Sequence, residues 1–302
     1  MKTDLAMAVV VLFLGTTGWG QPVLVHVDTA VVSNGKMVTN LTRNDFQVFD
    51  DDNVQSVIRF AGEEQPVDVL LVFHASSGML PTIQAFADAA HDGLQELHSG
   101  DRVAIMVFDA KDRVVLPFTG DLGAVERTLK NDMLNLPSSG QTTALAAASK
   151  AAGFLLGQSN DGRRRSVLHV FSMGVGIFQG SEEKRTERYW EADTVYNGMV
   201  VHALFGQGLG GLSSLSPALT ILKNTLTATV EDTGGELFSA RDARFFRDAL
   251  HHIRCRYSLW YERPMRGRFG LQATIAVELA KDTKKRYPKS KVHARSGYLL
   301  QR

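Results

Sequence analysis

An unbroken apolar stretch, residues 69–73, constrains the fold of this chain more than any other feature. It is preceded by Asp68 and is followed by small and polar residues that begin with His74. A run of this length that ends in turn-forming residues is typical of a strand buried on both faces of a parallel sheet. Ligands of such sheets bind just beyond the carboxyl ends of the strands, so the residues after Phe73 are the first place to expect a site.

The rest of the central region repeats this rhythm of buried strands and helices. Further apolar runs occupy residues 102–108, 166–171 and 199–205, and shorter strands are predicted at 114–118 and 234–238. Segments with helical spacing of apolar residues lie at 83–97, 122–134, 143–156, 185–197, 217–233 and 245–253. The alternation predicts an α/β fold with a doubly wound, mainly parallel sheet of the Rossmann type over residues 67–254.

The two ends of the mature chain have a different, β-type pattern. Residues 21–66 contain strand-like segments within 23–60, and residues 255–302 contain three more, at 257–261, 271–279 and 291–295. Neither set is long enough to bury a core alone. We therefore expect the C-terminal strands of 255–302 to pair with 21–66 in one small β subdomain that flanks the α/β domain.

Residues 1–20 have the composition of a secretory signal peptide. Lys2 precedes an apolar run at 5–14, and Gly18 and Gly20 supply small residues before a cut ahead of Gln21. The run is short for a bilayer span, so no membrane span is expected after cleavage; the alternatives are an uncleaved anchor or a buried N-terminal strand. We expect export to the periplasm or the extracellular space.

Two bulk properties narrow the class of partner and the compartment. The formal net charge is +1, which gives no general electrostatic case for a nucleic-acid partner or for an acidic membrane surface. Cys255 is the only cysteine, so no disulfide can form within the chain. An exported protein without disulfides fits a bacterial envelope better than a disulfide-dense secreted module.

Six short motifs occur in an order that is informative as a set. They lie at residues 41–50, 100–109, 143–145, 233–238, 257–261 and 292–298. In this order they resemble the bacterial von Willebrand factor A-related proteins, a family abundant in acidobacteria. The resemblance implies a von Willebrand factor A-like domain, whose family carries a metal-ion-dependent adhesion site at the tip of the sheet.

The resemblance also implies which positions would form that site, and two of them depart from the family pattern. The family has Asp-x-Ser-x-Ser after the first strand, a Thr before the third helix and an Asp after the third buried strand. His74 stands in place of the first Asp, and Met173 stands in place of the second. Magnesium prefers hard oxygen ligands, so an imidazole and a thioether are poor replacements for the two aspartate carboxylates. The expected site is therefore degenerate.

The remaining positions keep part of the pattern. Ser76 matches the first Ser, Gly78 replaces the second with Ser77 beside it, and Thr142 or Thr143 matches the Thr. Together with His74 and Met173 these residues form the predicted binding surface. No metal and no cofactor are expected; if magnesium binds, Ser76 and Thr143 would be its ligands.

The functional prediction is an exported, non-enzymatic protein-binding or scaffold protein with an unidentified protein partner. The alternative is a magnesium-dependent adhesion domain with a rebuilt site, and a hydrolase is a remote third class, since no Gly-x-Ser-x-Gly motif accompanies Ser76. The glycine-rich residues 206–211 resemble a dinucleotide motif but follow a late strand, which favours a flexible loop.

Three polar clusters are expected to be solvent-exposed. Residues 163–165 are consecutive arginines that predict a solvated turn. The basic residues 281–291 predict a solvated hairpin loop, and the alternative for them is an electrostatic contact with a polyanion. His251 and His252 are adjacent, which makes them poor co-ligands for a metal and predicts a place on the surface of a helix.

Overall fold

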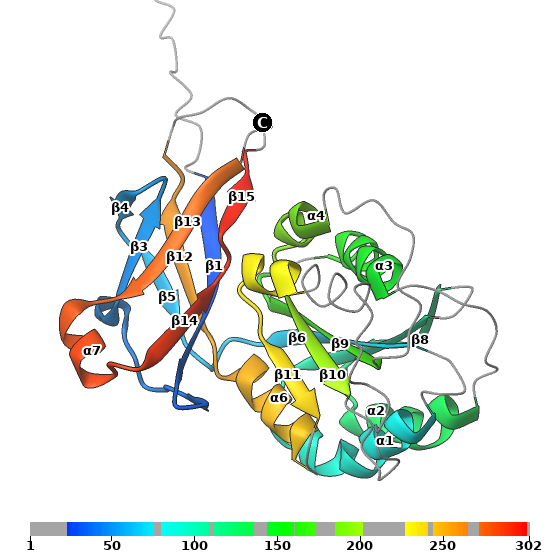
Figure 1. Ribbon diagram of the computed structural model, residues 1–302. Helices are drawn as coiled ribbons and strands as arrows, with labels where there is room; N and C mark the ends of the chain where they lie inside the picture. Colours follow the sequence, from blue (N-terminus) through cyan, green and yellow to red (C-terminus); the bar gives the residue numbers. More distant parts are fainter. Residues whose placement is uncertain are drawn as a thin grey trace, which may run out of the picture.

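The computed structural model describes residues 23–74, 80–108, 112–135, 144–159, 161–172, 185–201, 227–240, 244–264 and 272–300. Figure 1 shows two parts that lie side by side: a β-sandwich on the left of the view and a layered α/β domain on the right. The chain enters the sandwich first, crosses into the α/β domain, and returns to the sandwich for its last strands.

The α/β domain is built on a six-stranded sheet in the order β11-β10-β9-β6-β7-β8. Its strands are β6 (Val67–His74), β7 (Arg102–Phe108), β8 (Asp112–Thr119), β9 (Arg164–Ser172), β10 (Thr194–Val201) and β11 (Leu237–Ala240). All neighbours are parallel except β8, which runs antiparallel to β7 at the edge. Pro117 lies in this edge strand, where a missing N–H is tolerated.

Helices cover both faces of this sheet. One face carries α1 (Leu80–Leu94), α2 (Leu122–Arg127) with two continuing turns (Thr128–Asp132 and Met133–Asn135), and α6 (Phe245–Arg254). The other face carries α3 (Ala144–Leu156) and α4 (Arg185–Glu191). β6 contributes side chains to both cores, which is why its run of residues 69–73 is apolar without alternation. The predicted doubly wound α/β fold is confirmed.

Aromatic side chains fill the core on the α1 face. Phe86 of α1 packs edge-on against Phe73 of β6, with ring centroids 5.1 Å apart, and also contacts Phe245 and Phe246 of α6. All four lie in one buried cluster. The regularly spaced apolar residues of α1 therefore face both the sheet and the neighbouring helix α6.

The β-sandwich combines strands from both ends of the chain. One sheet has the order β14-β1-β12-β5, with β2 paired to β1, and the other has the order β15-β13-β3-β4. The strands are β1 (Leu24–Ser33), β2 (Lys36–Met37), β3 (Phe46–Asp50), β4 (Asn53–Gln55), β5 (Arg59–Ala61), β12 (Tyr257–Glu262), β13 (Gln272–Leu279), β14 (Ser290–Ala294) and β15 (Gly297–Leu299). Inward-facing residues of β1, β3, β12 and β13 share one buried core.

One predicted helix is shorter in the structure than its sequence pattern indicated. The helix expected over 185–197 ends at Glu191, and β10 already begins at Thr194. Asp193 takes a left-handed backbone conformation with φ 48°, which ends the helix. The β-branched Thr194 and Val195 then favour the strand.

The basic segment near the C-terminus is also different from the prediction. Residues 281–291 do not form a hairpin loop, because β13 and β14 belong to opposite sheets of the sandwich. A short helix, α7 (Lys281–Arg286), carries the chain from one sheet to the other. In the described part of the chain, no helix has both the length and the apolar composition to cross a membrane.

Candidate functional site

The carboxyl ends of β6 and β9 meet at the point where the direction of winding reverses. From β6 the chain proceeds to β7 on one side, and it later returns to β9 on the other side of β6. Phe73 of β6 is paired with Val170 of β9, so both strands end at the same edge of the sheet. Such a reversal leaves a crevice between the two following loops, where open α/β sheets bind their ligands.

His74 is the last residue of β6 and is paired with Phe108, the last residue of β7. The backbone therefore places His74 at the edge of the sheet where the winding reverses. Met173 directly follows Ser172, the last residue of β9. Six of the predicted site residues lie outside the described residues: Ser76, Ser77, Gly78, Thr142, Thr143 and Met173. The glycine-rich residues 206–211 and the predicted signal peptide, residues 1–20, also lie outside them.

A buried charge network holds the opposite, amino end of the same strands. Asp68, next to the start of β6, accepts hydrogen bonds from Arg102 Nε at 2.9 Å and from Arg163 Nε at 2.6 Å. Its neighbour Val67 donates its backbone N–H to Asp101 Oδ1 at 2.9 Å. Asp68 is thus fully engaged at the far end of the strand from His74, so it supplies no carboxylate to the carboxyl end of β6.

The prediction of a solvated arginine turn at residues 163–165 is wrong for two of its three residues. Arg164 is completely buried and donates to three backbone carbonyls, of Gln65, Ile253 and Arg254, at 2.8–3.4 Å. Arg165 is buried as well. Burial lowers the pKa of Arg164, and the nearby carboxylate of Asp28 opposes that shift.

The physical reason for this burial is the unsatisfied backbone at the end of α6. The last carbonyls of a helix have no partner within it and carry partial negative charge. Ile253 and Arg254 are the final residues of α6, and the planar guanidinium of Arg164 satisfies their carbonyls. A run of arginines in the sequence does not reveal which carbonyls will surround it. A solvent-exposed turn was therefore the expected structure.

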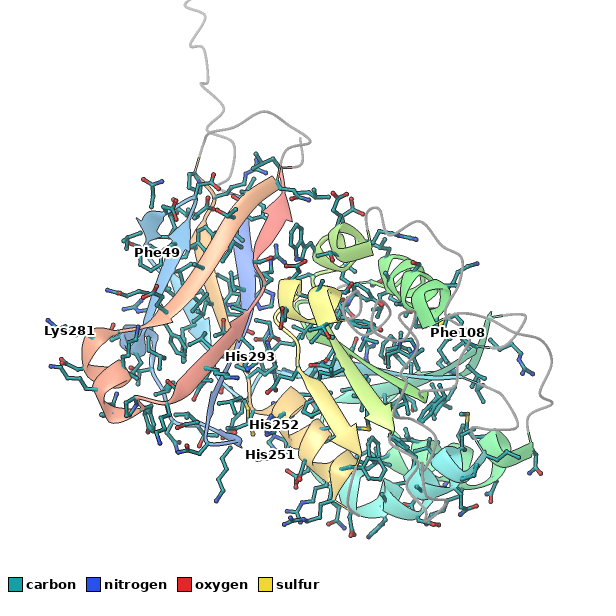
Figure 2. The ribbon with its side chains drawn as sticks, viewed as in Figure 1. Phe49, Phe108, His251, His252, Lys281 and His293 are labelled. Atoms are coloured by element: carbon teal, nitrogen blue, oxygen red, sulfur yellow. The ribbon has the colours of Figure 1, made fainter. Side chains whose placement is uncertain are left out.

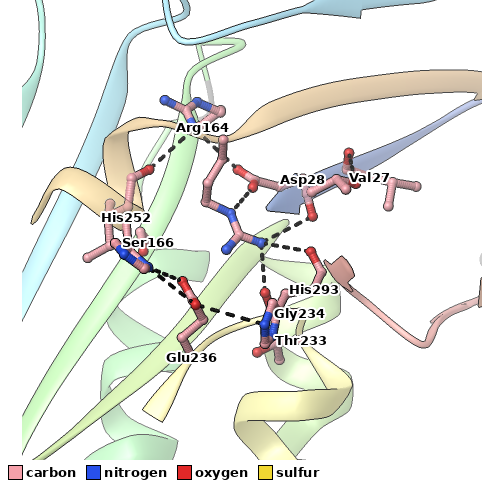
Figure 3. Close-up of polar contacts among 12 residues, drawn as sticks. Val27, Asp28, Arg164, Ser166, Thr233, Gly234, Glu236, His252 and His293 are labelled. Atoms are coloured by element: carbon pink, nitrogen blue, oxygen red, sulfur yellow. Dashed lines mark hydrogen bonds and ion pairs between the residues drawn. The ribbon is translucent and has the colours of Figure 1, made fainter. Parts of the chain in front are cut away.

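A second buried arginine connects the two parts of the molecule. Arg256, between α6 and β12, forms an ion pair with Asp28 of β1. Its Nη2 also donates to the carbonyl of Gly234 at 2.7 Å and to that of His293 at 3.3 Å. Figure 3 shows these groups around one junction, with Arg164 above Asp28. The sandwich and the α/β domain are therefore joined through buried charge.

A carboxylate and two histidines extend this junction. Glu236 Oε2 lies 3.0 Å from His252 Nδ1 of α6, and its Oε1 lies 3.9 Å from His293 Nε2 of β14. Burial alone would raise the pKa of Glu236, but the hydrogen bond and charge of His252 and the charge of Arg256 lower it overall. His252 and His293 come close together here, from the two parts of the molecule (Figure 2). The prediction of a surface position is wrong for His252, whose side chain is only 14% exposed, whereas the His251 side chain is 44% exposed.

None of these groups makes a metal site. Across the described ranges, no set of three or more His, Cys, Asp or Glu side chains is arranged to hold a metal ion. The clusters at Asp68 and Glu236 are instead neutralised by arginine and histidine partners.

Cys255 lies beside His251 and Glu96 in an arrangement that superficially resembles a nucleophile with its base. The thiol donates to Glu63 Oε2 at 3.5 Å, and His251 Nδ1 lies 3.7 Å from the sulfur and 2.9 Å from Glu96 Oε2. Burial, with the charge of Glu63, raises the pKa of Cys255 to about 12. A nucleophilic cysteine needs the opposite shift, because the thiolate is the reactive form.

Cys255 is therefore expected to react slowly with iodoacetamide in the folded protein. A pKa near 12 reduces the thiolate fraction at neutral pH by about a thousandfold relative to an ordinary cysteine. The rate is measured by mass spectrometry in buffer and in denaturant. Glu63→Gln removes the adjacent charge and should accelerate the reaction, while the distant Glu126→Gln should not. Equal rates in the folded and unfolded chain would contradict the assignment.

Comparisons with solved structures return proteins of low sequence identity. An aerotolerance-related membrane protein from Bacteroides fragilis NCTC 9343 is 15% identical, covering 62% of this chain and 98% of its own, with a TM-score of 0.47. The protein BatB from Bacteroides thetaiotaomicron is 15% identical, covering 62% and 97%, with a TM-score of 0.46. The SpRpn10 VWA domain is 14% identical, covering 62% and 94%, with a TM-score of 0.41.

No curated protein matches this sequence. Residues 69–177 match the family model of the von Willebrand factor type A domain. This range begins in β6 and extends past the end of β9, so it includes the carboxyl ends of both strands. The doubly wound domain of this chain therefore has the von Willebrand factor A fold, set on a β-sandwich.

Proposed function

We infer that this chain is an exported, non-enzymatic binding or scaffold protein whose A-type domain holds a protein partner without a metal ion. The observation that supports this most is the position of His74, at the end of β6 on the winding reversal. By the family resemblance an aspartate would stand here as a metal ligand. A neutral imidazole at this position favours direct contact with a partner over a shared magnesium ion.

The chemistry of the neighbouring loop residues fits the same proposal. Met173 follows β9, and Phe178 lies five residues further along. Methionine and phenylalanine form adaptable apolar contacts, which suit a protein partner better than a small polar ligand. Ser76, Ser77 and Thr143 would supply hydrogen bonds around them.

A non-enzymatic role is supported by the state of Cys255, the single thiol of the sequence. The raised pKa of the Cys255 thiol suppresses its reactivity as a nucleophile. Cys255 also lies at the junction with the sandwich rather than at the strand ends. The firmly held amino ends of β6 and β7 provide a rigid frame for the loops that make contact. Export rests on the composition of residues 1–20.

The test compares the wild-type chain with the double variant His74→Asp and Met173→Asp, which restores both carboxylates. We expect millimolar magnesium or EDTA to leave the melting temperature of the wild type unchanged. In the double variant magnesium should raise it by several degrees, because a ligand that binds only the folded state stabilises it by mass action. Differential scanning fluorimetry measures both effects. His91→Asp, on the exposed side of α1, is the matched control.

Partner capture then separates the possible outcomes. Envelope proteins retained by the immobilised wild type should be the same with and without EDTA and should be lost with the double variant. A magnesium-dependent rise in the wild type would instead favour the adhesion domain with a rebuilt site at Ser76 and Thr143. Capture that is unaffected by the double variant would remove the strand ends from consideration.

A further inference from the structure

The end of the β-sandwich that carries α7 is strongly basic. Its cationic side chains are all exposed: Lys36, Arg43, Lys281, Lys284, Lys285, Arg286, Lys289 and Lys291. They come from two segments that are more than two hundred residues apart in the sequence. Figure 2 places Lys281 at the outer tip of this end, at the far left of the view.

Strand pairing and α7 bring these segments together. Ser33 of β1 is paired with both Lys36 of β2 and Ser290 of β14, so the first hairpin lies beside Lys289 and Lys291. Ala280, just before α7, donates its backbone N–H to the carbonyl of Asp45 at 2.8 Å. This contact places α7 against the short turn at Arg43–Asp45.

Acidic residues neutralise only a minor part of this charge. Arg286 pairs with Asp45 at 2.5 Å, and Lys285 pairs with Asp282 at 3.2 Å. The other six cations have no ion pair with any described residue. Glu278 is exposed at the end of β13 next to α7, and Glu63 and Glu64 line a separate, neighbouring cavity. The end is therefore distinctly positive in a chain whose net charge is only +1.

A groove runs through this basic end between the first hairpin and α7. It has a volume of about 670 Å³ and is lined by the cations Lys36, Arg286 and Lys289, together with Met37, Tyr287 and Pro288. The lining combines positive charge with apolar surface. Such a combination suits a phosphate group attached to an apolar body.

We propose that this basic end docks on an anionic phospholipid surface, with a headgroup phosphate in the groove. Clusters of four to eight lysines and arginines are the usual signature of binding to anionic lipid. The cations here cover an end of the domain, on a hairpin, a turn and a helix, and do not follow a track along which a linear polymer would lie.

A nucleic acid fits this surface less well than a lipid headgroup. Single-stranded nucleic acids stack their bases on exposed aromatic rings. Tyr287 is the one aromatic residue lining the groove; it is half-buried, and the Arg286 guanidinium lies 5.8 Å from its ring centroid. A single half-buried ring does not form the platform of several aromatic side chains on which successive bases stack.

This docking goes beyond the proposed function and does not depend on it. α7 and the parallel sheet lie on opposite sides of the view in Figure 1. Attachment through the sandwich would leave the ends of β6 and β9 free for a protein partner. The two surfaces can therefore fail or succeed separately in experiment.

The test measures co-sedimentation of the purified full chain with vesicles. One set is phosphatidylcholine alone, and the other contains about 30% phosphatidylglycerol. The neutral vesicles report any insertion by the apolar residues 5–14, which all variants share. We expect binding to the anionic vesicles that is lost when the salt concentration rises from about 0.05 M to about 0.5 M, because salt screens exposed charges.

A matched pair of variants identifies the surface. Lys36→Gln, Lys281→Gln, Lys284→Gln and Lys289→Gln together should weaken binding at least about a hundredfold, since each cation contributes about fivefold near an anionic surface. The control neutralises four exposed cations of the α/β domain, Arg127, Lys130, Arg244 and Arg247, all to glutamine. It has the same change in net charge and should retain binding.

Three outcomes would overturn the proposal. The first is equal binding to neutral and anionic vesicles, and the second is equal loss in both quadruple variants. The third is displacement of the vesicles by millimolar inorganic phosphate, which would make the groove a site for a small anion. Retention of vesicle binding by the His74→Asp, Met173→Asp variant would show that the two proposed surfaces are separate.

Discussion

Replacing Asp28 with asparagine is expected to destabilise the protein by about 3–5 kcal/mol. Asp28 is the carboxylate that faces two buried guanidiniums: it pairs with Arg256, and its Oδ2 lies 4.0 Å from Arg164 Nη1. Without this negative charge both arginines would remain buried and uncompensated, which is far less favourable than exposing them to water. Urea unfolding of the variant and the wild type at equilibrium measures the difference.

The control for this substitution is Asp282→Asn. Asp282 pairs with Lys285 at 3.2 Å, but both side chains are mostly exposed, at 92% and 69%. A pair in water contributes little, so the expected change is within about 0.5 kcal/mol. Similar losses in the two variants would mean that the junction does not depend on its buried charge, and the account of how the two parts are joined would be wrong.

The same contrast explains which parts of the fold could be predicted from the sequence. The apolar run of β6 and the helical spacing of α6 are local patterns, and each directly reports a buried face. Asp28 and Arg256 are 228 positions apart, and neither has a local pattern that identifies the other. The burial of Arg164 depends in turn on where α6 ends. Long-range polar contacts of this kind are set by topology, which the sequence pattern gives only coarsely.

The candidate site divides in the same way. The apolar run of β6 and the small polar residues after it are enough to predict a site beyond the end of this strand. The winding reversal between β6 and β9 is known only from the sheet order in the structure. His74, Ser76 and Ser77 were expected there because they follow the buried strand, whereas Thr143 and Met173 were expected from the family resemblance. Asp193 adopts a left-handed backbone conformation that ends α4 early. The spacing of apolar residues does not predict the backbone conformation of a single residue.

The turn at residues 233–235 shows what one short motif does once the fold is known. The Thr233 hydroxyl accepts a hydrogen bond from the backbone N–H of Tyr196 at 3.0 Å and donates one to the carbonyl of Thr229 at 2.9 Å. It therefore fixes the end of the helical residues 227–232 against β10. Thr233 also bridges to Arg295 of the sandwich. Gly234 supplies the carbonyl that Arg256 binds. The turn is therefore a contact point between the two parts of the molecule.

Gly234→Ala is expected to destabilise the protein by about 2–5 kcal/mol, because two costs act together. The residue has φ +77°, a left-handed conformation that strains any side chain, and an added Cβ would lie 2.5 Å from the carbonyl carbon of Ala294. Gly162 has nearly the same conformation, φ +75°, but no atom within 4 Å of an added Cβ. Gly162→Ala should therefore cost only the conformational part, about 1–2 kcal/mol. Urea unfolding measures both, and the excess loss in Gly234→Ala reports how closely the turn packs on the sandwich. Equal losses would show that the sandwich and the α/β domain are not in close contact at Gly234.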